Sequence, residues 1–214
     1  MDSRSWDQRY AEGARNGTVW GAEPNRWLVA ETREMSPGRA LDLAAGEGRN
    51  ALWLAQQGWQ VVAVDFSAIA LQTGQQIAEQ MGPQVADHTT WVYADLLEYV
   101  PERSAFDLVL LSYLHLPAPA RRTVLRQAAG ALAPGGTLLV IGHDATNPTD
   151  GHGGPRDASV LFTADDVVAE LTTDAEGLPA LTVVRAGAVE RPVETPEGPR
   201  TAIDALARLQ RPVA

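Results

Sequence analysis

Glycines and acidic residues follow one another closely between residues 40 and 66, with the spacing of a nucleoside-binding site. The segment ALDLAAGEGRN places Asp42 in an apolar stretch, shortly before Gly46 and Gly48. Asp65 ends a second apolar stretch, about twenty residues after the glycines, where an acid can accept hydrogen bonds from ribose hydroxyls. Glycines let backbone N–H groups approach a ligand without a Cβ in the way. The segment therefore predicts a bound nucleoside cofactor.

Three further features narrow the nature of this cofactor. Asp42 stands where a dinucleotide site normally carries an apolar residue. It suits a positively charged ligand better than a pyrophosphate, or else it binds donors of the N-terminal segment. Asp95 follows a third apolar stretch and could accept from an exocyclic amine such as adenine N6. Because Ser67 can cap the following helix, we assign Asp65 to the ribose rather than to a helix cap.

Two histidines are candidates for acid–base chemistry. His143 ends a predicted strand beside Asp144, and a carboxylate close to an imidazole can poise a base near neutral pH. His115 follows the preceding strand. The side chains of residues adjacent in sequence need not meet in space. His143 and His115 are therefore candidate catalytic residues, without an assigned partner.

Missing residue types limit the other chemistry. The chain has no cysteine, and all 17 of its basic residues are arginine. A thiolate nucleophile, a Cys-ligated metal site, a Schiff-base lysine and a P-loop lysine are therefore excluded. We expect no metal site.

The composition is that of a soluble globular protein. With 45% hydrophobic and 21% charged residues, 214 residues predict a single domain. The net charge of −10 argues against nonspecific binding to nucleic acid, which depends on Lys and Arg contacts to phosphates. The polar start is not a signal peptide, and no apolar run approaches the roughly 18 residues of a membrane span. We expect a cytoplasmic protein without membrane contacts.

Strand-like and helix-like segments alternate along the chain. The predicted strands are 40–43, 61–64, 88–93, 106–111 and 137–141, and the predicted helices are 24–35, 49–57, 68–80, 117–132 and 163–171. Two antiparallel strands, 181–189 and 201–208, follow. This order predicts an α/β fold with an open, doubly wound, mostly parallel sheet of seven strands and a C-terminal antiparallel hairpin. Right-handed crossovers would bring the ligand-binding ends of the parallel strands to one edge.

The same order predicts how the single domain, 1–214, is organised. An N-terminal helical lid segment (1–37) precedes the cofactor-binding core (38–143). A mobile loop (144–162), rich in Gly, Pro and polar residues, connects the core to a helix and the terminal hairpin (163–214).

Five motifs in order, LDLAAGEGRN, VVAVDFS, YADL, FDLVLLSYLHL and LAPGGTLLVIG, resemble those of class I S-adenosylmethionine-dependent methyltransferases. The N-terminal pattern WDQRYAEG…VWGAEPNRWL and the GxGRN turn are most similar to the small tellurite-resistance or thiopurine-type branch. The usual Cys of that branch is Ala45 here, which leaves the backbone of the turn able to bind the cofactor. The resemblance implies a Rossmann-like methyltransferase fold and S-adenosyl-L-methionine as the cofactor.

The resemblance also implies roles for individual residues. The methionine moiety would be contacted by Ala44, Gly46 and Gly48, and the ribose and adenine would be bound after the second and third strands by Asp65, Phe66, Asp95 and Leu96. The methionine end and the acceptor would be faced, after the fourth strand, by Ser112 and Tyr113. Two aromatic residues, Tyr10 and Trp20, would close over the cofactor.

The predicted function is methyl transfer to a small-molecule acceptor by in-line displacement, achieved mainly through positioning. The alternatives are a nicotinamide-dependent oxidoreductase and a non-catalytic cofactor-binding protein that acts as a sensor or assembly partner. Asp42, the terminal hairpin and the missing lysine argue against the oxidoreductase. We expect a small-molecule substrate, no nucleic-acid partner, and a monomer or homodimer.

Overall fold

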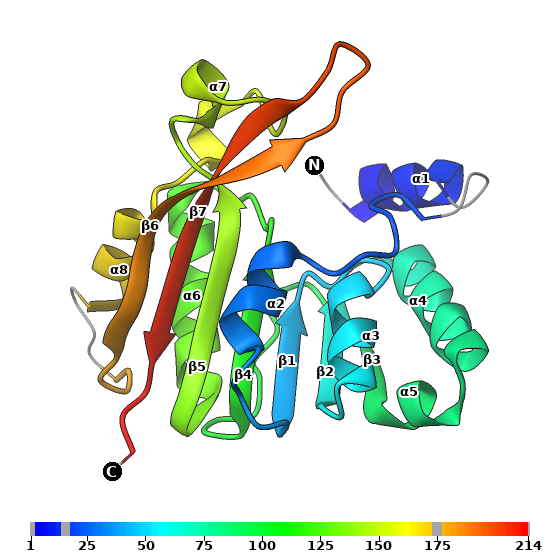
Figure 1. The fold of residues 1–214 in the computed structure, drawn as a ribbon. Helices are drawn as coiled ribbons and strands as arrows, with labels where there is room; N and C mark the ends of the chain where they lie inside the picture. Colours follow the sequence, from blue (N-terminus) through cyan, green and yellow to red (C-terminus); the bar gives the residue numbers. More distant parts are fainter. Residues whose placement is uncertain (1–2, 14–17, 173–176, 214) are drawn as a thin grey trace. The chain divides into compact units, whose positions relative to one another are not determined.

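The computed structural model describes residues 3–13, 18–172 and 177–213, and these form two compact units. Unit 1 comprises residues 1–100 and 106–110, and unit 2 comprises residues 101–105 and 111–214. The seven strands form one sheet in the order β3-β2-β1-β4-β5-β7-β6 (Figure 1). The predicted α/β sheet, mostly parallel with an antiparallel C-terminal hairpin, is thereby confirmed. The assignment of the whole chain to a single domain stays a prediction.

Unit 1 alternates short strands with helices. Its elements are α1 (Ser3–Gly13), α2 (Arg26–Thr32), β1 (Arg39–Leu43), α3 (Arg49–Gln56), β2 (Gln60–Asp65), α4 (Ala68–Met81), α5 (Pro83–His88), β3 (Thr89–Tyr93) and most of β4 (Phe106–Ser112). Strands β1, β2 and β3 are parallel, with Leu43 opposite Val64 and Asp65 opposite Tyr93. Their carboxyl ends therefore lie at one edge of the sheet, as predicted.

Polar caps set the helix boundaries of unit 1. The side chain of Asn25 accepts hydrogen bonds from the backbone N–H of Trp27 and Leu28, so α2 begins two residues later than predicted and is shorter. Ser67 caps α4 as predicted, because its Oγ accepts from Ala70 N. The helix α5 was not predicted. It begins at Pro83, whose fixed φ suits the first turn of a helix.

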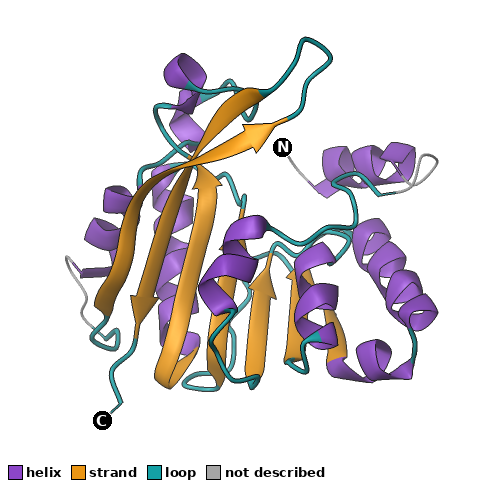
Figure 2. Ribbon diagram, in the orientation of Figure 1, coloured by secondary structure: helices purple, strands orange, loops and turns teal. Residues whose placement is uncertain are grey.

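Unit 2 is built around three long strands. It holds α6 (Ala118–Ala131), β5 (Leu132–His143), the short helix α7 (Asn147–Asp150), the 3-10 turn η2 (Ala158–Val160), α8 (Ala164–Thr172), β6 (Thr182–Val193) and β7 (Arg200–Gln210). Strand β7 lies between β5 and β6 and is antiparallel to both (Figure 2). The terminal hairpin is therefore longer than predicted and leaves β6 at the edge.

Two predicted features of unit 2 differ from the structure. Strand β5 begins at Leu132 rather than at 137, because the Pro-Gly-Gly segment does not end in a free turn. Instead Gly135 N donates to Arg211 O, and Arg211 N donates to Gly136 O. The segment 144–162, expected to be a loop, contains α7, η2 and a bridge between Asp144 and Phe162. Within the described ranges, no helix is long and apolar enough to cross a bilayer.

Candidate functional site

The turn between β1 and α3 has an unusual backbone. Ala44, Gly46 and Gly48 all have positive φ, at 63°, 57° and 79°. A left-handed backbone conformation is strained for a residue with a Cβ. Ala44 therefore adopts it with backbone strain, whereas Gly46 and Gly48 adopt it without. Ala45 N donates to Val64 O, which fastens the turn to β2. Residues 44–48 are called the glycine turn below.

A buried carboxylate fixes the shape of the glycine turn. Asp65 Oδ2 accepts from Gly46 N at 2.8 Å, and Oδ1 accepts from Ser67 N at 2.9 Å. Burial raises the pKa of Asp65, and these backbone donors oppose that rise. Each carboxylate oxygen has a second lone-pair direction with which it can accept from a ligand hydroxyl. Asp65 therefore lies at the turn, as predicted, and also supports it.

Trp91 in β3 is a neighbour of the glycine turn that the sequence did not reveal. A Cβ added to Gly48 or to Gly74 would overlap its indole, and one at Gly74 would also lie 2.8 Å from Glu47 O. The turn is therefore packed closely against both α4 and β3. Gly74 could have indicated this contact from the sequence, because a glycine inside a helical segment often marks a close approach.

The N-terminal segment meets the glycine turn through aromatic side chains. Tyr10 is buried, and its Oη would lie 2.7 Å from a Cβ on Gly46. Trp20 Nε1 donates to Tyr10 Oη at 3.4 Å, while Trp6 stacks on the Tyr10 ring with 5.7 Å between centroids. Burial raises the pKa of Tyr10 to about 12, so the hydroxyl keeps its proton. Tyr10 thus lies against the turn, and Trp20 is 46% exposed.

Hydrogen bonds link the described part of the N-terminal segment to the rest of unit 1. Val19 N donates to Glu47 Oε2, and Asn25 N donates to Asn50 Oδ1, both at 2.8 Å. A third link joins α1 to α4, since Ser67 Oγ donates to Asp7 Oδ1 at 2.5 Å. None of these contacts involves Asp42, and both predicted roles of Asp42 stay predictions.

Asp42 is instead a buried carboxylate without a well-formed hydrogen bond. Its side chain is 1% exposed, and neither oxygen has a partner of good geometry. Burial raises the pKa of Asp42 to about 7, a rise opposed by the guanidinium of Arg49 and, weakly, by the backbone of Ala51, and reinforced by Asp65. A buried carboxylate in this state would be stabilised by a cation nearby.

The residues predicted to contact adenine lie beyond the ends of β2 and β3. Phe66 is half-buried and Leu96 is buried, whereas Asp95 is exposed. Asp95 Oδ1 accepts from Leu97 N at 2.9 Å, so one carboxylate oxygen closes its own turn. The adenine contacts of these three residues stay predictions.

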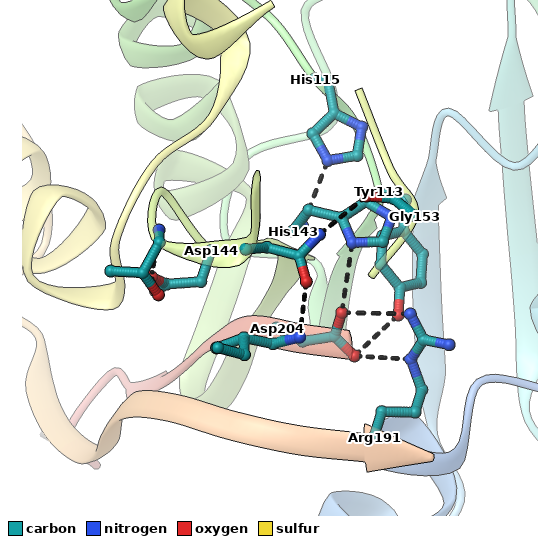
Figure 3. A network of polar contacts seen from close by, with 10 residues as sticks. Tyr113, His115, His143, Asp144, Gly153, Arg191 and Asp204 are labelled. Carbon is teal, nitrogen blue, oxygen red and sulfur yellow. Dashed lines mark hydrogen bonds and ion pairs between the residues drawn. The ribbon is translucent and has the colours of Figure 1, made fainter. Parts of the chain in front are cut away.

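Unit 2 contains a second polar site, built around Asp204 in β7. Asp204 is fully buried, and Figure 3 shows side chains converging on its carboxylate. Tyr113 Oη donates to Oδ2 at 2.9 Å, Arg191 Nε donates to Oδ2 at 2.7 Å, and Arg191 Nη2 donates to Oδ1 at 3.3 Å. His143 Nδ1 lies 3.6 Å from Oδ1. These four residues and His115 are called the Asp204 cluster.

The Asp204 cluster contains both predicted catalytic histidines but not Asp144. The rings of His115 and His143 stack at 15° with 5.4 Å between centroids, and His143 N donates to His115 Nε2 at 3.2 Å. Asp144 Oδ1 accepts from the backbone and the hydroxyl of Thr146 instead. His143 and Asp144, although adjacent in sequence, therefore have different partners, because consecutive residues of an extended segment point to opposite faces. The catalytic roles of His143 and His115 stay predictions. Asp204 and Arg191 were missed.

The segment after β4 enters the cluster with a strained backbone. Ser112 ends β4, and Tyr113 follows it with φ 58°, a left-handed conformation that is costly for a tyrosine. Tyr113 N donates to Ile141 O, and its ring lies 5.0 Å from that of His143. Burial is the main cause that raises the pKa of Tyr113, and the Asp204 charge adds to it.

Across the part of the chain that the structure describes, no group of three or more His, Cys, Asp or Glu side chains is arranged to hold a metal ion.

Part of the chain, including the glycine turn, is similar to known proteins. Residues 40–136 match the family model described as a methyltransferase domain. The chain is 34% identical over 117 residues to demethylmenaquinone methyltransferase of Clavibacter sepedonicus, covering 53% of this chain and 46% of the relative. It is 30% identical over 154 residues to tRNA 5-carboxymethoxyuridine methyltransferase of Escherichia coli K12, covering 68% and 58%. The chain thus spans only about half of the length of these relatives.

Solved structures share the fold at low sequence identity. TehB from Haemophilus influenzae superposes with a TM-score of 0.67 at 15% identity, covering 87% of this chain and 62% of that one. The N-methyltransferase NodS from Bradyrhizobium japonicum WM9, solved in complex with S-adenosyl-L-homocysteine, superposes with a TM-score of 0.64 at 20% identity, covering 86% and 83%. At such identities the likeness shows the shared Rossmann-like fold.

Proposed function

We propose that this chain, which carries a class I S-adenosylmethionine-dependent methyltransferase domain over residues 40–136, transfers a methyl group from S-adenosylmethionine to a small-molecule acceptor. The observation that carries the proposal is the glycine turn, held in a left-handed shape by the buried Asp65. Its placement in the branch that includes tellurite-resistance proteins stays a prediction, although the fold shared with TehB is consistent with it.

The residues around the glycine turn suit the parts of this cofactor. Asp65 has lone pairs left for the ribose diol, and the backbone of Ala44, Gly46 and Gly48 can approach the methionine moiety closely. Asp42, whose buried carboxylate lacks a hydrogen-bonded partner, would balance the positive charge of the sulfonium and ammonium groups. A cationic ligand explains this acid better than a pyrophosphate does.

The chemistry demands mainly positioning from the protein. When bound, the cofactor supplies a methyl group on a positively charged sulfur, which is already activated for displacement. The chain must hold the acceptor in line with that methyl group, since alignment removes most of the entropic barrier. Tyr10, Trp6 and Trp20 would exclude water over the methionine end, which strengthens the remaining polar contacts.

A small acceptor is proposed because of the charge of the chain. With a net charge of −10, the protein lacks the electrostatic attraction that nucleic-acid substrates require. The tRNA-modifying relative makes tRNA the alternative to test. A monomer or homodimer in the cytoplasm is part of the same proposal.

Calorimetry with three ligands tests the cofactor. S-Adenosylmethionine and S-adenosylhomocysteine should both bind, and NADH should not. Asp65→Ala removes the acceptor of Gly46 N and should weaken S-adenosylhomocysteine binding at least about tenfold. Asp87→Ala, which removes an exposed aspartate on α5, is the matched control and should bind as the wild type does. Binding of NADH alone, or equal affinity in Asp65→Ala and wild type, would refute the assignment.

Methyl transfer is tested with labelled cofactor. A cell extract divided into a small-molecule fraction and a bulk tRNA fraction is incubated with the protein and methyl-labelled S-adenosylmethionine. Label should enter the small-molecule fraction and depend on Asp65. Label in the tRNA fraction would show that the acceptor is a nucleic acid. Cofactor binding with no transfer to either fraction would favour the sensor alternative.

A further inference from the structure

The chain between α1 and α2 is fastened to the glycine turn and to the start of α3 (Figure 1). Its described part, residues 18–25, is called the strap below. Side chains from the sequence GEGRN each bind a backbone group of the strap. The pairs are Glu47 Oε2 with Val19 N at 2.8 Å, Arg49 Nη1 with Glu23 O at 3.1 Å, and Asn50 Oδ1 with Asn25 N at 2.8 Å. The motif therefore fixes the path of the strap through its backbone.

Glu47 differs from the other two side chains because it belongs to the glycine turn itself. It is buried, with 4% of its surface exposed. Burial raises the pKa of Glu47, and the backbones of Val19 and Trp20 oppose that rise. The second oxygen, Oε1, is buried and has no hydrogen bond among the described residues. A buried carboxylate with an unused oxygen is costly, so stability alone does not account for a glutamate at this position.

The strap brings Trp20 to Tyr10 beside the glycine turn. Trp20 Nε1 donates to Tyr10 Oη at 3.4 Å, and that hydroxyl would lie 2.7 Å from a Cβ on Gly46. Trp20 directly follows Val19, so the hydrogen bond to Glu47 sets where the backbone of Trp20 lies. A closed series of contacts within unit 1 thus leads from the turn through Glu47 and the strap back to the turn.

We propose that Glu47 is a positioning residue, which holds the strap over the methionine moiety of S-adenosylmethionine and so couples cofactor binding to closure of the strap. This inference rests on the proposed function, in which the glycine turn binds that moiety. Glu47 acts through the strap, by keeping Trp20 and Tyr10 at the turn. Coupling of this kind is reciprocal, so the bound cofactor must stabilise the closed strap as well.

A purely structural role for Glu47 has a different consequence. If the side chain only supported the glycine turn, its loss would also disturb Asp65, which accepts from Gly46 N. Binding of the adenosine part of the cofactor would then fall as much as binding of the methionine part. A positioning role confines the loss to ligands that carry the amino-acid end.

Calorimetry with two ligands separates these roles. S-Adenosylhomocysteine carries the amino-acid end, and 5′-methylthioadenosine has the adenosine without it. Glu47→Ala should weaken binding of S-adenosylhomocysteine about tenfold, the size of one charge-assisted hydrogen bond, and should change that of 5′-methylthioadenosine less than about twofold. Glu47→Gln keeps an oxygen that can accept from Val19 N and should recover most of the affinity. Glu79→Ala removes an exposed glutamate on α4 and is the matched control, with both affinities unchanged.

Trp20→Ala gives a second test that leaves the glycine turn itself unaltered, because Trp20 is 46% exposed. It should show the same selective loss as Glu47→Ala. Since both residues act through one strap, the double variant should bind S-adenosylhomocysteine no more weakly than the weaker single variant. Losses that add in full would mean that the two side chains act separately, against the inference.

Amide hydrogen exchange followed by NMR reports closure of the strap directly. Saturation with S-adenosylhomocysteine should slow exchange of the Val19 N–H about tenfold in the wild type and leave it unchanged in Glu47→Ala. Equal loss of both ligands in Glu47→Ala, or Val19 exchange that does not respond to the cofactor, would overturn the inference. A wild type that binds no S-adenosylhomocysteine would instead refute the proposed function, and the inference with it.

Discussion

The glycine turn and the Asp204 cluster both depend on a buried carboxylate, but they use it in different ways. Asp65 accepts from two backbone N–H groups, and all its partners lie within about twenty residues in sequence. Asp204 accepts from the side chains of Tyr113 and Arg191, and Tyr113 is 91 residues away. Backbone N–H groups are present whatever the side chain, so the first site can survive substitutions of the donor residues. The second site depends on the identity of the side chains that form it. The backbone-held site is the one to which we assign the proposed cofactor.

The largest expected effect comes from breaking the side-chain cluster. Arg191→Met leaves Asp204 buried without its cation and should lower the free energy of unfolding by about 3–5 kcal/mol. Urea unfolding measures the loss. The double variant Arg191→Met with Asp204→Asn removes both charges and should recover much of the stability. A double variant as unstable as the single one would show that packing, and not charge, holds the cluster.

A smaller loss is expected from the backbone-held site. Gly48→Ala introduces a Cβ at φ 79° against the Trp91 indole and should cost about 2–5 kcal/mol, combining backbone strain and overpacking. Binding of S-adenosylhomocysteine should fall in parallel. Gly82→Ala is the control, because Gly82 has φ 106° and open space around it, so it reports strain alone. Equal losses of stability in the two variants would mean that the Trp91 side chain moves aside, so that overpacking adds nothing to the backbone strain.

The pH dependence of stability isolates Asp42. The pKa of Asp42 rises from an ordinary 3.8 to about 7 on folding, so the folded state binds the proton more tightly than the unfolded state. Its contribution to stability is therefore complete below pH 3.8 and is lost as pH rises through about 7. Asp42→Asn should lack this decline. Urea midpoints of both proteins across this range measure it, and parallel curves would contradict the raised pKa.

The smallest effect is expected at Asp95. Its side chain is exposed and one oxygen already closes a local turn, so Asp95→Asn should change S-adenosylhomocysteine affinity by less than about fivefold. Calorimetry beside Asp65→Ala gives the comparison directly. If Asp95→Asn were as damaging as Asp65→Ala, an exposed side chain would be as important to binding as the backbone-held turn.

The sequence was most informative where structure is local. The glycines, Asp65 and the cap at Ser67 act within a few residues of one another or across adjacent strands, so their spacing predicted their roles. The partner of His143 could not be found in this way. Asp204 lies directly opposite His143 in the pairing of β5 with β7, a register set by long strands that close only in three dimensions. A single acid within the apolar run AIDALARL was the only local signal.

The position of β7 has a consequence for biosynthesis. Because β7 lies between β5 and β6, neither neighbour has its partner until residues 200–210 have been synthesised. During translation the apolar β5 therefore has unpaired backbone N–H and C=O groups along one edge. Such an edge can bind chaperones or cause aggregation. Ribosome-bound chains stalled before residue 200 should be sensitive to protease in unit 2. Chains in which β7 has been synthesised and has left the ribosome should be resistant.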